Sequence, residues 1–389
     1  MNTMPTLILD RTKCLKNIEK MALKAKRKGL GFRPHFKTHQ SAGIGDWFRD
    51  FGVSEITVSS FRMAEYFAGA GWKDLLVAFP FNPSDLTCLN QLAEKHTISI
   101  LVDNPEVLLF LQKLDNRVPF YIDIDTGYGR TGVRSDDFQH VERIIRRSRK
   151  LRNLEFAGFY CHAGHSYQAG GPTERERIHR KAIADLKALK DRFSETHPRV
   201  LYGDTPNCST REDFEGIDVI TPGNFVFYDL FQHSIGSCRE EDIAVAMACP
   251  VVSKYPGERK LLIHGGAIHF SKEVLNMEGR TVYGKGVVFH EGNILKKALA
   301  AVKTKGSDRS RTPEKGISFA GEGWLAMGDP VYLAGISQEH GIIRDCPLRL
   351  FDGLQLGDLI CLLPVHSCLT ANLMGGYVTL EGRKIGMMH

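Results

Sequence analysis

The chain has 389 residues, of which 42% are hydrophobic and 25% charged, and its formal net charge at pH 7 is +6. These proportions are ordinary for a globular protein, and no apolar run approaches the ~20 residues that cross a bilayer. We therefore expect no membrane association, and Met1–Pro5 lacks the basic and apolar pattern of a secretion signal. Nine dispersed cysteines without a Cys-x-x-Cys pair are typical of reduced thiols, which favours a cytoplasmic protein.

The densest run of positive charge lies at residues 143–152, where six basic residues fall on an expected helix. No aromatic residues interleave with them, although surfaces that bind nucleic acid commonly combine the two residue types. The run is therefore interpreted as a solvated helix face, and no nucleic-acid partner is expected.

Residues 8–245 alternate between amphipathic helical stretches and short apolar strands. The first helix is expected over Asp10–Lys28, with Asp10 or Thr12 as its N-cap. Eight strands are expected, at Gly31–His35, Glu55–Ser59, Asp74–Ala78, Ile98–Val102, Phe120–Ile124, Glu155–Tyr160, Val200–Gly203 and Asp218–Thr221. Further helices are expected at Ser60–Ala70, Asn82–Lys95, Asn104–Leu114, Ser135–Arg149 and Pro172–Thr196. Eight such units favour an α/β fold of the TIM-like (β/α)8 type, although a doubly wound open sheet would also alternate.

Residues 246–389 have mainly strand patterns and are expected to form a second, mainly-β domain, which residues 1–7 are candidates to join. Its strands are expected at Ala248–Ser253, Arg259–Gly265, Gly316–Ala320, Val331–Ile336, Asp358–Pro364 and Tyr377–Leu380. Only Asn293–Thr304 has a helical pattern, and the polar segment 303–315 is interpreted as an exposed loop.

Lys37 follows the first expected strand of the barrel, inside the sequence Arg-Pro-His-Phe-Lys-Thr-His. A lone lysine after a strand is usually a surface charge. His35 and His39 flank this one, however, and barrel enzymes place their chemistry at the C-terminal ends of strands. A partly desolvated lysine beside other cationic groups is suited to form a Schiff base with a carbonyl compound.

Arg130 lies in a glycine-rich segment that follows another expected strand, Asp-Thr-Gly-Tyr-Gly-Arg-Thr-Gly. The glycines allow the backbone to approach a ligand closely, and an arginine offers a permanent positive charge to an anionic oxygen. The alternative is an ordinary turn in which Arg130 pairs with Asp125.

Two loops after the seventh and eighth expected strands offer hydroxyl and backbone N–H groups, Gly203–Thr210 and Thr221–Asp229. Barrel enzymes commonly hold a phosphate group at this position, although plain turns have the same composition. No Walker-type Gly-x-x-x-x-Gly-Lys sequence is present, so a nucleotide is not implied. The segment Gly158–Tyr167 adds titratable side chains at the end of a further strand.

His366 and Cys368 lie two residues apart near the C-terminus, in Pro-Val-His-Ser-Cys. In an extended segment both side chains would leave the same face, and imidazole with thiolate suits a zinc ion. A His-x-Cys sequence is common by chance, and two protein ligands are fewer than zinc usually has.

Together these sequences resemble the fold-type III pyridoxal-phosphate enzymes, a group that includes alanine racemase. The Pro-x-His-x-Cys sequence and the two loops are similar to those of the branch that contains D-serine dehydratase and D-threonine aldolase. The resemblance extends from Leu7 to the C-terminus. It implies a homodimer in which Lys37 carries pyridoxal 5'-phosphate and the pair His366 and Cys368 binds Zn²⁺.

The resemblance also implies roles for five residues around the cofactor. Arg130 is expected near the phenolic oxygen of the cofactor ring and Tyr167 near the ring itself. The phosphate is expected against Thr205, Gly223 and Asn224.

The implied reaction is β-elimination of water from D-serine or a related D-3-hydroxy amino acid, with a 2-oxo acid and ammonia as products. Three alternatives stay open, which are a metal-dependent D-threonine aldolase that yields glycine and acetaldehyde, a metal-free racemase, and a cofactor-binding protein without turnover. The thiolate ligand favours zinc over harder ions, which favours the dehydratase. The sequence does not reveal the preferred substrate, the partner of the ring nitrogen or a third metal ligand.

Overall fold

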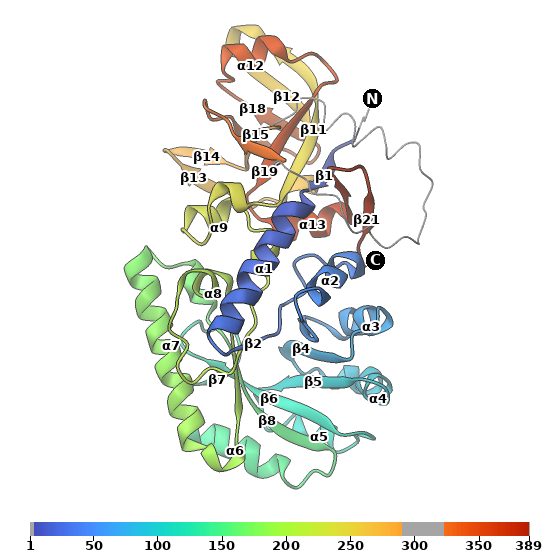
Figure 1. Ribbon diagram of the computed structural model, residues 1–389, viewed down its shortest axis with the longest axis vertical. Coiled ribbons are helices and arrows are strands. Elements are labelled where there is room, and N and C mark those ends of the chain that lie inside the picture. Colours follow the sequence, from blue (N-terminus) through green and yellow to red (C-terminus); the bar gives the residue numbers. More distant parts are fainter. Residues whose placement is uncertain (1–3, 290–322, 389) are drawn as a thin grey trace. The chain divides into compact units, whose positions relative to one another are not determined.

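The computed structural model describes residues 4–289 and 323–388 (Figure 1). The chain divides into two compact units. The first comprises Ile18–Phe225 with Met388, and the second comprises the segment that ends at Asn17 together with Val226–Met387. The division had been expected at residue 245. Among the described residues, no helix is long and apolar enough to cross a membrane.

Eight parallel strands of the first unit form one sheet in the order β2-β10-β9-β8-β6-β5-β4-β3. Their bounds are β2 Gly31–Phe32, β3 Glu55–Val58, β4 Asp74–Pro80, β5 Thr97–Val102, β6 Val118–Asp125, β8 Leu154–His162, β9 Arg199–Gly203 and β10 Val219–Ile220. A parallel bridge between His35 and Thr57 joins the two ends of this sheet. The Phe36 N–H donates to the Thr57 carbonyl at 2.9 Å, and the Thr57 N–H donates to the Pro34 carbonyl at 2.9 Å. The strands therefore close into the expected barrel and not into an open sheet. The short β7 (Val133–Arg134) pairs with β6 outside the ring.

The helices of this unit mostly follow the sequence prediction. Their bounds are α1 Arg11–Arg27, which begins in the second unit, α2 Ala42–Arg49, α3 Phe61–Gly69, α4 Leu86–Ala93, α5 Leu108–Leu111, α6 Phe138–Ser148, α7 Pro172–Arg192 and α8 Thr205–Thr210. Asp10 caps α1 by accepting the Lys13 N–H at 3.0 Å. The prediction of one long helix over Asn104–Leu114 is wrong, because the Asn104 side chain accepts the Glu106 N–H and closes a turn first. The helices α2 and α8 were not predicted, and α8 replaces most of the loop expected at Gly203–Thr210.

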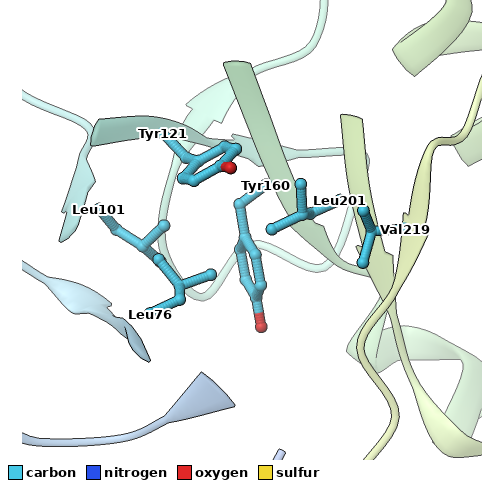
Figure 2. Packing of buried hydrophobic residues seen from close by; sticks show 6 residues of the cluster. All are labelled: Leu76, Leu101, Tyr121, Tyr160, Leu201 and Val219. Carbon is cyan, nitrogen blue, oxygen red and sulfur yellow. The ribbon is translucent and has the colours of Figure 1, made fainter. Parts of the chain in front are cut away.

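Side chains from six strands converge inside the barrel (Figure 2). They are Leu76, Leu101, Tyr121, Tyr160, Leu201 and Val219. All six are at most 5% exposed, so the inside of the barrel at these residues is a packed core. Burying such apolar surface contributes about 25 cal/mol per Å² and holds the strand ends that carry functional groups in fixed positions.

A buried ion network joins the start of the barrel strands. The guanidinium of Arg33, only 1% exposed, lies 3.1 Å from a carboxylate oxygen of Glu55 and 2.7 Å from one of Asp74. Arg199 reaches the other oxygen of Glu55 at 2.7 Å. Arg33 and Glu55 are tolerated at low exposure because each is paired, whereas Asp74 and Arg199 also reach solvent.

The second unit is built on an antiparallel sheet in which six strands form a ring, β12-β18-β17-β15-β19-β11, closed by pairing of β11 with β12. Their bounds are β11 Val245–Tyr255, β12 Lys260–His264, β15 Gly284–Phe289, β17 Tyr332–Ile336, β18 His340–Ile343 and β19 Leu359–Pro364. Further strands are β1 Thr6–Leu9, β13 Leu275–Met277, β14 Arg280–Val282, β16 Trp324–Ala326, β20 Gly376–Thr379 and β21 Lys384–Gly386. The expectation of a mainly-β C-terminal domain is confirmed.

Four short helices of this unit were not predicted: α9 Leu230–Ser234, α10 Ala267–Phe270, α12 Leu348–Gly353 and α13 Ser367–Met374. Segments of four to eight residues complete too few turns to establish a helical period, so the pattern did not reveal them. The helix expected at Asn293–Thr304, the strand at Gly316–Ala320 and the loop at 303–315 lie outside the described residues.

Candidate active site and metal-binding pair

Lys37 lies in the turn that follows the first barrel strand, at the C-terminal end of the barrel. The ring of the preceding residue, Phe36, packs against Phe48, Phe67 and Trp72 at centroid distances of 4.9, 5.0 and 5.1 Å. Phe36 is completely buried, whereas the Lys37 side chain is exposed. The aromatic cluster thus anchors the turn, while Lys37 itself stays accessible.

Two neutral histidines lie near Lys37. Burial, together with the charge of Lys37, holds the pKa of His35 well below its usual value. Burial and the charges of Lys37 and Arg130 lower the pKa of His162 to about 3. Its Nδ1 lies 2.8 Å from the Gly203 carbonyl, which can only accept, so Nδ1 donates and Nε2 keeps its lone pair.

Arg130 ends a turn that the Asp125 carboxylate holds in place. One oxygen of Asp125 accepts the backbone N–H groups of Gly127, Tyr128 and Gly129 at 2.7–3.1 Å. The guanidinium carbon of Arg130 lies 5.2 Å from the centroid of the Tyr128 ring. Asp125 therefore organises the loop, and the charge of Arg130 acts on His162.

The loops after β9 and β10 offer a small polar cradle. The backbone N–H of Thr205 donates to the Tyr167 hydroxyl at 3.2 Å, while the Thr205 side-chain hydroxyl is buried and has no hydrogen-bond partner among the described residues. Asp204 caps α8 by accepting the Asn207 N–H. A Cβ atom on Gly223 would lie 3.0 Å from the His35 carbonyl, so the backbone approaches closely there.

The structure places all six expected cofactor residues in segments that follow barrel strands at one end of the barrel: Lys37, Arg130, Tyr167, Thr205, Gly223 and Asn224. A phosphate oxygen could accept a hydrogen bond from the buried Thr205 hydroxyl, so the residues present fit a phosphorylated cofactor. Sequence reasoning did not single out His162 or Asp123. Burial raises the pKa of Asp123, on β6, to about 6. The positions of His162 and Asp123 near the C-terminal ends of expected strands are the sequence signal that could have identified them.

The expectation of an extended segment at the His-x-Cys sequence is wrong. His366 is the N-cap of α13 and Cys368 lies in its first turn. The two side chains nevertheless meet. Burial alone would lower the pKa of His366, but a hydrogen bond to Cys368 and the charges of Cys368 and Asp229 raise it to about 9.

Asp229 fixes the start of α13. One of its oxygens accepts both the N–H and the hydroxyl of Ser367, at 3.0 and 3.1 Å. Imidazole and thiolate side by side are donors that zinc prefers, so this pair fits a zinc ion.

Comparison with known proteins identifies two successive domains. Residues 9–229, over half of the chain, match "Alanine racemase, N-terminal domain", and residues 244–380 match "Putative serine dehydratase domain". D-serine dehydratase of Dictyostelium discoideum is 25% identical over 97% of this chain and 93% of its own length.

D-threo-3-hydroxyaspartate dehydratase of Delftia sp. is 25% identical over 97% of this chain and 93% of its own length. Its solved structure covers 100% of this chain and 98% of its own chain with a TM-score of 0.83 at 23% identity, which shows a shared fold. The 3-hydroxy-D-aspartate aldolase of Paracoccus denitrificans is also 25% identical, over 98% of this chain and 89% of its own length.

Proposed function

We propose that this chain, which belongs to the alanine racemase-like family and carries a serine dehydratase domain, is a pyridoxal-phosphate- and zinc-dependent lyase that removes water from D-serine or a closely related D-3-hydroxy amino acid. The products would be a 2-oxo acid and ammonia. A homodimeric assembly and a cytoplasmic location are parts of the same proposal. The family membership and the dehydratase relatives support it.

The barrel end supports the cofactor. Lys37 would hold pyridoxal phosphate, Tyr167 would lie at its ring, and Thr205, Gly223 and Asn224 would receive its phosphate. Bound pyridoxal phosphate supplies an electron sink that stabilises negative charge on the α-carbon of an amino acid.

Lys37 is the group of this chain best placed to take the α-proton, since its exposed amine is anchored by the buried Phe36. The neutral His162 offers its Nε2 lone pair as an acceptor beside it. Arg130 would bind an anionic oxygen, and its fixed charge also opposes protonation of His162. Arg130 would therefore bind and orient an anionic group, while Lys37 and His162 would accept protons.

The hydrogen-bonded pair of His366 and Cys368 is the observation that carries the choice of a dehydratase over a racemase. Hydroxide is a poor leaving group, and a bound zinc ion would supply a Lewis acid that makes the β-oxygen a better one. A racemase, which only moves the α-proton, has no comparable need for soft metal ligands.

The test is turnover of D-serine by the protein saturated with pyridoxal phosphate, with pyruvate and ammonia measured together. Treatment with a chelator should abolish product formation, and added zinc should restore it. Cys368→Ser should lower turnover at least about 100-fold, whereas Cys88→Ser, a cysteine of α4, should leave it unchanged. Racemisation to L-serine that survives the chelator would contradict the proposal.

A further inference from the structure

Three metal-binding side chains from separate elements meet in the second unit. His264 ends β12, His269 lies in α10, and Glu339 lies in the turn between β17 and β18. One potential ligand atom of each lies within 4.8 Å of the other two. None of the three belongs to the His366 and Cys368 pair.

The distances suit one small cation. The Nε2 atom of His264 and an oxygen of Glu339 are 3.1 Å apart, and the rings of His264 and His269 are nearly perpendicular with centroids 5.5 Å apart. Two metal bonds of about 2.1 Å at the tetrahedral angle place their donor atoms about 3.4 Å apart, so this pair would have to separate by only about 0.3 Å. His269 is only 7% exposed, so its ring is held by packing.

The backbone fixes these elements before any metal binds. The Gly265 N–H donates to the Glu339 carbonyl at 2.9 Å, and the Ala267 N–H donates to the Ser337 carbonyl at 2.8 Å. A Cβ atom at Gly266 would lie 2.4 Å from the Ser337 carbonyl oxygen, so only glycine permits this approach. A framework held this closely gives the three donors little freedom to separate.

We infer that His264, His269 and Glu339 form a second zinc site, which clips the end of β12 and helix α10 to the β17–β18 turn. Two imidazoles and one carboxylate are a zinc donor set, and imidazole favours zinc over Mg²⁺ or Ca²⁺. With three protein ligands, water would take the fourth position. The site does not depend on the proposed function.

Two contacts compete with the metal. His264 Nε2 and the Glu339 carboxylate share a hydrogen bond at 3.1 Å, which zinc binding would replace. The Nδ1 atom of His269 accepts the Gly266 N–H at 3.2 Å. Zinc binding through Nδ1 would replace this hydrogen bond, and binding through Nε2 would turn Nδ1 from an acceptor into a donor. Either way two hydrogen bonds are exchanged for three metal bonds.

The experiment measures zinc bound by the full chain after treatment with chelator, dialysis and addition of Zn²⁺ alone. Cys368→Ser serves as the background, because it removes the sulfur ligand of the other pair. This variant should bind one zinc, and X-ray absorption should show only nitrogen and oxygen neighbours. Adding Glu339→Gln or His269→Asn should weaken that zinc at least about tenfold.

His340→Ala is the matched control, because His340 lies next to Glu339 and its ring contacts Ser337. It should leave the zinc in place. If His269→Asn does not fold, as judged by circular dichroism, Glu339→Gln decides alone. Absence of stoichiometric zinc in Cys368→Ser, or zinc that survives Glu339→Gln undiminished, would overturn the inference.

A failure of the proposed function has a different signature. Zinc bound to nitrogen and oxygen alone in Cys368→Ser, together with no elimination activity in the wild type, would retain this site and reject the lyase assignment.

Discussion

The hydroxyl of Tyr167 accepts a hydrogen bond from the backbone N–H of Thr205, with 3.2 Å between the two atoms. This contact ties the short helix η2 (Gly164–Tyr167) to the start of α8. There the buried Thr205 hydroxyl has no hydrogen-bond partner within residues 4–289 and 323–388. It thus links the residue expected at the cofactor ring with one expected at the phosphate.

Tyr167→Phe should weaken binding of pyridoxal phosphate about two- to tenfold, because one hydrogen bond contributes about 0.5–1.5 kcal/mol. Fluorescence titration of the cofactor measures the change. Tyr66→Phe is the control, since the Tyr66 hydroxyl likewise accepts a backbone N–H, from Ala42. If Tyr167→Phe and the wild type bind pyridoxal phosphate equally well, Tyr167 is not part of the cofactor site.

Lys37→Ala should abolish the visible absorbance of the protein-bound cofactor and lower turnover at least about 100-fold. The reason is that no other amine follows the first barrel strand directly. Lys113→Ala, at an exposed lysine of the same unit, should change neither quantity. Colour that persists in Lys37→Ala would show that another group holds the cofactor.

Arg33→Met should destabilise the barrel by about 3 kcal/mol, because it removes the partner of Asp74 and leaves Glu55 with Arg199 alone. We take the lower end of the usual range because the Asp74 side chain is 40% exposed and water screens it. Arg134→Ala, which breaks an exposed pair with Asp136, should cost far less, because water screens that pair. Chemical unfolding monitored by circular dichroism compares the two, and equal costs would contradict the account.

His39 makes stability depend on acid. Burial lowers its pKa in the folded chain to about 3, well below the ~6.5 of an unfolded histidine. Between these values the unfolded chain binds the extra proton. The contribution of neutral His39 to the free energy of unfolding is therefore complete above pH ~6.5 and is lost as the pH falls toward 3.

His39→Asn should reduce the slope of unfolding free energy against pH by about 1.4 kcal/mol per pH unit between pH 4 and 6. The asparagine oxygen can still accept the Ser41 N–H that now donates to Nδ1. His197→Asn is the control, because His197 is exposed and asparagine tolerates its left-handed backbone, with φ of 47°. An unchanged slope in His39→Asn would show that His39 does not titrate on unfolding.

The barrel was predictable because its strands are buried on both faces and therefore appear as continuous apolar runs. In β5, for example, every residue after Thr97 is buried. The closure of the barrel was not predictable from local pattern, since it depends on hydrogen bonds between residues 34–36 and Thr57. The eight-unit count pointed to the right alternative without proving it.

The ends of strands were harder to interpret than their interiors. The order of the strands in the barrel decides that His162 comes near Lys37, and no sequence spacing encodes that proximity. The same holds for His264 and Glu339, which are 75 residues apart. The helix after His366 had a usable signal in Gly375, whose φ of 64° is typical of a helix C-cap.

The most direct test of the central claim is product analysis after incubation of the protein, saturated with pyridoxal phosphate, with D-threonine, with and without a chelator. We expect 2-oxobutyrate and ammonia in equal amounts, lost with the chelator and restored by zinc. Glycine with acetaldehyde as the products would contradict the dehydratase proposal and identify an aldolase. The Paracoccus denitrificans relative is named as an aldolase of another substrate, 3-hydroxy-D-aspartate.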